Sequence, residues 1–168
     1  MKKQANVGSN VKIQGFFRLN ITEGLDGKIV GDSGWVKNNI TNTGFQHYIV
    51  QLIGNSTGSS RVTHAALGEG TAPGDAATSL ESEISGSNGS GRKAVTFSEI
   101  GSKTCQWVCT FGSADSFVTA TETIKNVGLF ATSTQGGGSM FCGNTYATST
   151  VATNQNVNLT YQVRFATS

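Results

Sequence analysis

The sequence predicts an all-β (mainly β) protein: an antiparallel β-sandwich, jelly-roll or immunoglobulin-like, with one short α-helix near residues 43–53. Three observations predict this class. Apolar and polar residues alternate in several segments, Gly, Asn and Ser clusters separate those segments, and one stretch alone has helical spacing. The 168 residues are enough for one core, so we expect an N-terminal arm at residues 1–10 and a single β-sandwich domain at residues 11–168.

The first predicted strand runs from Val11 to Ile21. Its odd positions are apolar or Gly, and Phe16 is the only large apolar residue on the other face, so one face of the strand is expected to be buried. Asp26-Gly27 is typical of a hairpin turn, and residues 28–30 are expected to run back beside the first strand.

One stretch has the spacing of an amphipathic helix. Its apolar residues fall at intervals of three and four, and Gly54 stands where a C-terminal glycine is common. Asn42 or Thr43 is expected to cap the N-terminal end. The apolar stripe consists of Phe45, Tyr48, Ile49, Leu52 and Ile53.

The second half of the chain is rich in predicted strands, which brings the expected total to eight to ten. The expected strands cover residues 61–67, 93–100, 103–111, 124–132, 140–146 and 157–165. Thr78 to Glu81 has capping-box spacing, which predicts a short helical turn, and residues 85–91 are expected to form an exposed loop.

Three cysteines are predicted to pack in the core rather than to bind a metal. Cys105, Trp107 and Cys109 point to the same face of a strand, and an odd number of cysteines argues against a disulfide framework. The third thiol is Cys142. We expect no cofactor and no metal site.

The polar residues do not form a recognisable catalytic motif, and we expect no enzyme. His47 is expected on the surface and His64 half-buried in a strand. Glu81 and Glu83 lie in a Ser-rich stretch that is typical of a surface, and the Arg92-Lys93 pair is interpreted as solvated. A net charge of +2 and the lack of a long apolar run favour neither nucleic acid nor a membrane as partner.

A set of short segments occurs in an order that resembles a group of small β-rich structural proteins of tailed bacteriophages. These segments are residues 34–41, Gly44 with the helix after it, and residues 66–73, 78–84, 124–130 and 159–165. The resemblance covers residues 34–165, and each segment alone is weakly specific. This chain has Asn126 where an acidic residue often precedes the Gly-Leu-Phe of that group, so no binding residue is carried over there.

The resemblance implies a virion structural protein made in the host bacterial cytoplasm. The leading hypothesis is a capsid decoration or cement protein that binds the major capsid protein or other virion proteins and forms a homo-oligomer, with a trimer favoured. A tail, baseplate or fibre-attachment subunit is the alternative. A carbohydrate-binding module is a further hypothesis, which needs an exposed aromatic platform such as Trp35 with Tyr146. The expected interface residues lie in the arm: Met1, Lys2, Lys3, Gln4, Asn6 and Asn10.

Overall fold

A computed structural model describes residues 11–24, 26–50, 60–86, 91–101 and 103–167, and the arm predicted at residues 1–10 lies outside them. These residues form ten strands and a short helical segment. The strands are β1 (Val11–Glu23), β2 (Lys28–Asp32), β3 (Val36–Ile40), β4 (His64–Gly68), β5 (Arg92–Ala94), β6 (Thr96–Gly101), β7 (Thr104–Phe111), β8 (Glu122–Phe130), β9 (Met140–Val151) and β10 (Gln155–Thr167). The helical segment joins α1 (Asn42–Gly44) to a turn of π-helix (Phe45–Val50).

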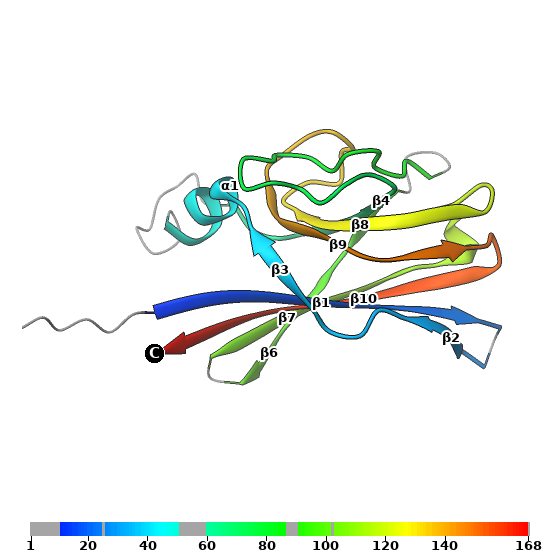
Figure 1. The fold of residues 1–168 in the computed structure, drawn as a ribbon, viewed down its shortest axis with the longest axis horizontal. Coiled ribbons are helices and arrows are strands. Elements are labelled where there is room, and N and C mark those ends of the chain that lie inside the picture. The colour runs from blue at the N-terminus through cyan, green and yellow to red at the C-terminus, as the bar shows by residue number, and fades with distance from the viewer. Residues whose placement is uncertain (1–10, 25, 51–59, 87–90, 102, 168) are drawn as a thin grey trace, which may run out of the picture.

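The strands build one antiparallel sheet that folds into two layers (Figure 1). Its order is β5-β4-β8-β9-β3-β1-β10-β7-β6, with β2 beside β1. The first layer holds β2, β1, β10, β7 and β6, and the second layer holds β5, β4, β8 and β9. The prediction of a mainly antiparallel β-fold with one short helix is confirmed.

Two crossings connect the layers and nearly close the sheet into a barrel. Strand β3 pairs with β1 through residues 36–38 and with β9 through Asn39 and Ile40. Strands β5 and β6 stand at the two ends of the order, yet Val95 alone separates them in sequence. Its backbone N–H donates to the carbonyl of Thr63. The strand predicted at residues 93–100 is therefore broken at Val95, where the chain changes layer.

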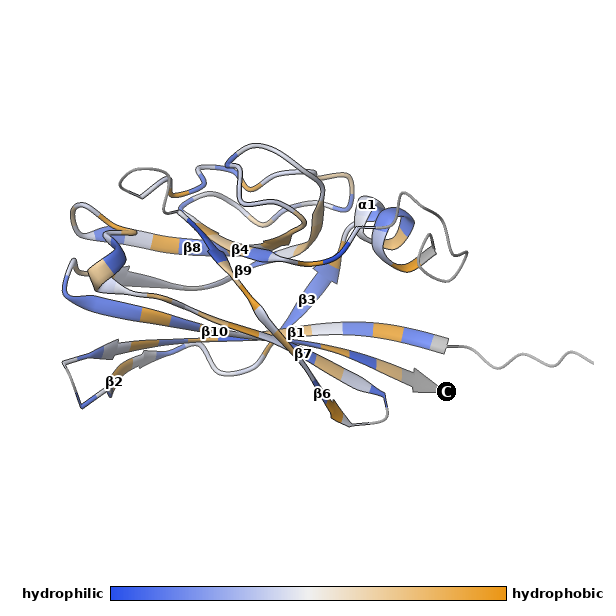
Figure 2. Cartoon of the chain, turned by 180° about the vertical axis from the view of Figure 1, so that it is seen from behind, coloured by the Kyte–Doolittle hydropathy of each residue, from blue (hydrophilic) through white to orange (hydrophobic). Residues whose placement is uncertain are grey.

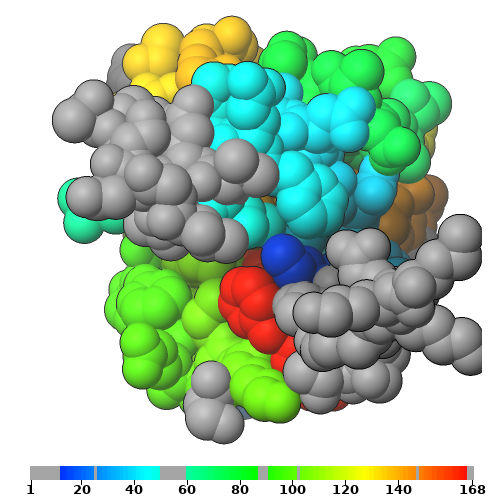
Figure 3. All heavy atoms as spheres, turned by 90° about the vertical axis from the view of Figure 1, so that its left-hand side faces the viewer, coloured from blue at the N-terminus to red at the C-terminus, as the bar shows by residue number. Residues whose placement is uncertain are grey.

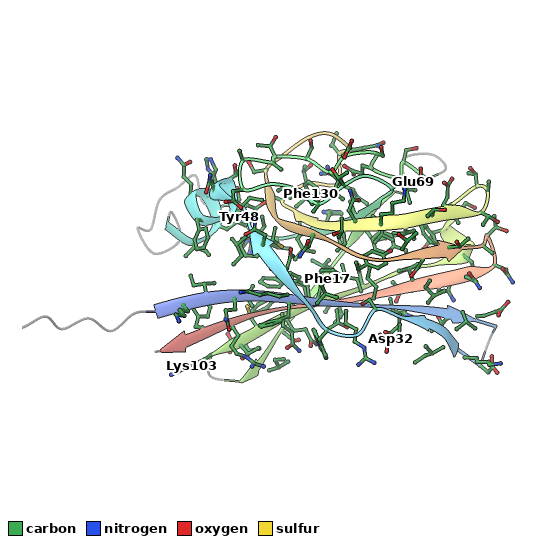
Figure 4. The ribbon with its side chains drawn as sticks, viewed as in Figure 1. Phe17, Asp32, Tyr48, Glu69, Lys103 and Phe130 are labelled. Atoms are coloured by element: carbon green, nitrogen blue, oxygen red, sulfur yellow. The ribbon has the colours of Figure 1, made fainter. Side chains whose placement is uncertain are left out.

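The core lies between the layers and follows the period of two seen in the sequence (Figure 2). In β1 the side chains of Phe17, Leu19 and Ile21 are buried, as the alternation predicts. Figure 4 shows Phe17 in the space between the two layers. On the opposite face of β1, Phe16 is half-buried, and the guanidinium of Arg164 lies 5.9 Å from its ring centroid.

The helix begins one residue earlier than predicted. The cap is Thr41, not Asn42 or Thr43: its Oγ1 accepts from the Gly44 N–H at 2.9 Å and donates to the carbonyl of Met140 at 2.8 Å. A second hydrogen bond thus joins the cap to β9, which sequence reasoning had no means to detect.

The predicted apolar stripe of the helix is only partly confirmed. Tyr48 is buried and Ile49 is half-buried, but Phe45 is 39% exposed. A π-helix has a wider turn than an α-helix, so spacings of three and four no longer place every apolar residue on one face. Residues 52 and 53 lie outside the described residues.

The prediction of a short helical turn at Thr78 to Glu81 is wrong. These residues form bends and a turn, and Leu80 is buried beside Phe130 and Met140. The carboxylate of Glu81 accepts from the Thr71 N–H at 2.8 Å and from its hydroxyl, rather than capping a helix. The Glu81 carboxylate therefore fixes the loop after β4, and its oxygens accept from Thr71 instead of from the first N–H groups of a helix.

Candidate functional site

A large apolar cleft opens at the end of the molecule where β1 begins and β10 ends. We call it the end cleft; its volume is about 780 Å³. The helical segment and residues 60–63 form one wall, and residues of β6, β7, β9 and β10 form the floor and the opposite side. Figure 3 looks onto this end, with the helical segment above and β6 and β7 below. The lining residues that the argument uses are Tyr48, Ile49, Phe97, Cys105, Trp107 and Phe165.

Aromatic rings stack through the floor of the end cleft. The ring centroid of Trp107 lies 5.6 Å from that of Phe97, 6.1 Å from that of Phe141 and 6.0 Å from that of Tyr161. Tyr161 is buried, whereas Phe97 is 54% exposed and Phe165 is 39% exposed. The inner face of the first layer therefore continues past the part that the second layer covers, and its outermost aromatic rings meet solvent.

The free edge of β6 borders the end cleft. In the described part of the chain, β6 is the last strand of the sheet and pairs with β7 alone. The charged residues of the lining are Arg61, Glu99 and Lys103, and the last of these is labelled in Figure 4. An apolar trough beside an unpaired strand edge suits an extended peptide, whose backbone can pair with the edge while alternate side chains enter the trough.

A second, smaller pocket of about 260 Å³ is acidic and lies beside the loop after β4. Glu69, Glu83 and Glu122 line it together with Phe117. Partial burial, a hydrogen bond to Glu69 and the charge of Glu69 raise the pKa of Glu122. Glu69 in turn accepts from the Thr123 N–H at 3.2 Å. The described residues contain no group of three side chains suited to a metal ion.

The third carboxylate of this pocket, Glu83, is neutralised from the inside. Arg92 donates to both of its oxygens, from Nε at 2.6 Å and from Nη2 at 2.9 Å. The guanidinium also donates to the carbonyls of Thr132 and Gly137, and it lies 3.7 Å from the ring centroid of Phe130. The side chains are 0% and 4% exposed, so the interpretation of Arg92 as solvated and of Glu83 as a surface residue is wrong. Lys93, by contrast, pairs with Asp115 at the surface.

Asn126 joins three of the segments that carry the resemblance. It is fully buried on β8, and its Nδ2 donates to the carbonyls of Thr71 and Glu81, each at 3.1 Å. Gly68 faces it so closely that a Cβ there would lie 2.4 Å from its Oδ1. An isolated β-bridge between Gly68 and Glu83 joins the end of β4 to residues 78–84. Residues 66–73, 78–84 and 124–130 therefore depend on one another at this point.

The cysteines and histidines lie where the sequence places them, with one exception. Cys105, Trp107 and Cys109 face Val163, Tyr161 and Leu159 across the sheet and pack against the core, as predicted. All three thiols are free, and burial raises the pKa of Cys105 and, to about 12, that of Cys109. His64 is half-buried as predicted, and burial followed by the charge of Arg92 lowers its pKa. His47 is half-buried rather than fully on the surface.

Trp35 and Tyr146 do not form a shared aromatic platform. Trp35 is 48% exposed, but Tyr146 is half-buried and its ring meets that of Phe17 edge-on at 6.1 Å. The six arm residues expected at an interface, Met1, Lys2, Lys3, Gln4, Asn6 and Asn10, lie outside the described residues.

Sequence reasoning missed Arg92, Asn126 and the free edge of β6, because their roles arise from partners far away in the chain. Among the described residues, no helix has the length and apolar character needed to cross a membrane. Comparison of the chain with family models, with curated proteins and with solved structures found no match in any of the three.

Proposed function

We propose that this chain is a structural subunit of a tailed bacteriophage particle, with a place on the capsid as a decoration or cement protein. The observation that carries the proposal is the meeting of three resembling segments at Asn126. Segments that match by chance would be scattered over the fold. Segments that hold one joint together are expected when a whole structural framework is shared, and the proteins whose sequence segments these resemble are virion components.

The distribution of exposed apolar side chains supports a role in assembly. Two exposed aromatic side chains, Phe97 and Phe165, line the end cleft, and Ile100 is exposed on β6 beside it. Ile29 and Val30 are exposed on β2. Large apolar residues that cluster on a surface are typical of protein contacts. A subunit that packs against neighbours on a shell would bury them.

The test is to purify the particles of the bacteriophage that encodes this chain and to count its copies by quantitative mass spectrometry. Hundreds of copies per particle, with density for the two-layer fold on the shell in electron micrographs, are expected. A handful of copies would place the subunit in the tail, baseplate or fibre attachment instead. Particles that lack the chain altogether would overturn the proposal.

A further inference from the structure

We propose that the end cleft of one copy receives the N-terminal residues 1–10 of a second copy, which pair as an added strand with the free edge of β6. The inference deepens the proposed function, since it names the contact through which such a subunit would bind itself. It rests on the geometry of the cleft, on the unpaired edge and on the pattern and length of residues 1–10.

The end cleft has the form that a peptide strand requires. The residues of β6 that line it are Phe97, Glu99 and Gly101, which alternate with residues that do not. A strand added beside β6 would place every second side chain over the aromatic floor around Trp107. The backbone hydrogen bonds of the added strand do not depend on its side chains, so even a polar segment can contribute them.

Residues 1–10 have the matching period of two over their first seven positions. Met1, Ala5 and Val7 are the apolar residues and all stand at odd positions, together with Lys3. The even positions 2, 4 and 6 are Lys, Gln and Asn. One face of such a strand would be mainly apolar and would enter the cleft, and the other face would be polar and would meet water.

The start of β1 places these residues at the correct end of the molecule. Val11 pairs with Thr167, and the carbonyl of Lys103 accepts from the N–H of Phe165, so the start of β1 and the cleft-lining end of β10 lie together. Ten extended residues reach about 33 Å, which is enough to leave one subunit and enter the next.

The same geometry makes it unfavourable for residues 1–10 to enter the end cleft of their own chain. Strands β10, β7 and β6 stand between β1 and the added strand, so the chain would have to reverse and cross four strand spacings, about 19 Å. This path uses about six of the ten residues and leaves fewer than the six of β6 to pair with it. A second copy needs no reversal. Because each copy both gives and receives, contacts of this kind repeat head to tail, and a rotation of one third of a turn between copies would close them into the trimer expected from the resemblance.

Native Cys105 in the end cleft provides a direct test on the purified full-length chain. Four single variants, Gln4→Cys, Ala5→Cys, Asn6→Cys and Val7→Cys, are treated with a bismaleimide crosslinker that spans two strand spacings, about 10 Å, because β6 lies between the added strand and Cys105 on β7. The reaction is run at alkaline pH because burial raises the pKa of the Cys105 thiol. We expect Ala5→Cys and Val7→Cys to form crosslinked oligomers on denaturing gels, with Cys105 in the linked peptides. The two even-position variants should resemble the wild type. Adding Cys105→Ser to Val7→Cys should abolish the linkage.

Each other result overturns the inference. Linkage at even and odd positions alike would show that the arm is not paired as a strand. Absence of linkage would show that the arm does not reach the cleft. A crosslink from position 7 to Cys105 within one chain would show that the arm folds back onto its own chain. Circular dichroism of every variant checks that the fold is kept. No particle is used, so this result and the presence of the chain in purified particles are decided separately.

Discussion

Arg92 and Glu83 form a bidentate ion pair that is buried from solvent. The pair closes the loop before β5 against the end of β8, since the same guanidinium covers the ring of Phe130. Nine residues of sequence separate the partners. A buried ion pair is not strong evidence for net stability, but the loss of one partner leaves the other charge without compensation.

Replacing Glu83 by Gln is therefore expected to lower the free energy of unfolding by about 3–5 kcal/mol, because the guanidinium of Arg92 stays buried without a counter-charge. Urea denaturation followed by tryptophan fluorescence measures the change. The control is Arg18→Gln in the exposed pair of Arg18 with Asp32, where a much smaller loss is expected. Equal losses in the two variants would contradict the role assigned to burial.

Asn126→Asp tests the joint between the three resembling segments. The substitution replaces the donating Nδ2 by an oxygen that faces the carbonyls of Thr71 and Glu81, in a site without solvent. We expect a loss of about 3 kcal/mol or more at neutral pH. Asn42→Asp, at an exposed position near the helix start, should change stability by less than about 0.5 kcal/mol. If both variants unfold at the same urea concentration, Asn126 does not hold the joint.

Glu122→Gln tests the acidic pocket through the pH dependence of stability. The pKa of Glu122 is raised in the folded state by partial burial and by Glu69, so its contribution is full below the unfolded pKa and is lost as the pH rises through the folded pKa. The variant removes this loss. Its melting temperature should exceed that of the wild type at about pH 7, and the difference should vanish below about pH 4. A gain of equal size below about pH 4 would contradict this contribution of Glu122.

Ile49→Asp and Phe45→Asp compare the buried and the exposed side of the helical segment. Ile49 is half-buried against the core, so a carboxylate there should destabilise the fold by about 2 kcal/mol or more. Phe45 belongs to the same predicted stripe but is exposed, and a loss below about 1 kcal/mol is expected for it. Thermal melts followed by circular dichroism rank the two variants, and the reverse order would contradict the π-helical turn.

Deletion of residues 1–9 separates folding from assembly. These residues precede β1, so the truncated chain should keep the circular dichroism spectrum and melting temperature of the full chain. Its binding to particles from which the subunit is missing should fall, as measured by co-sedimentation. Truncated chain that decorates such particles as well as the full chain would exclude a role for these residues in attachment.

The sequence predicts the parts of this fold that rest on local patterns. The alternation in Val11 to Ile21 and around Trp107 identifies strands whose buried faces the structure confirms, because a strand that lies on a core repeats every two residues. The break at Val95 carries no such signal. It depends on where the two layers meet, and there the N–H of Val95 donates to the carbonyl of Thr63, which lies far away in the sequence.

The candidate site was harder to predict than the fold. Arg92-Lys93 looks like a solvated pair, yet one cation turns inward to Glu83 and the other outward to Asp115. Which of the two side chains is buried depends on the partners that the fold brings close to each. The end cleft has no motif at all, because residues from the helical segment, β6, β7, β9 and β10 each contribute a few side chains to it.

The pairing of Val11 with Thr167 has a practical consequence for engineering. Both strands that carry the chain's extremities finish side by side at one pole of the barrel. A peptide or fluorescent domain fused directly before Val11 or directly after Thr167 would leave the sheet beside the end cleft. In a regular lattice of such subunits, domains fused at either of these positions would project from the equivalent end of every copy.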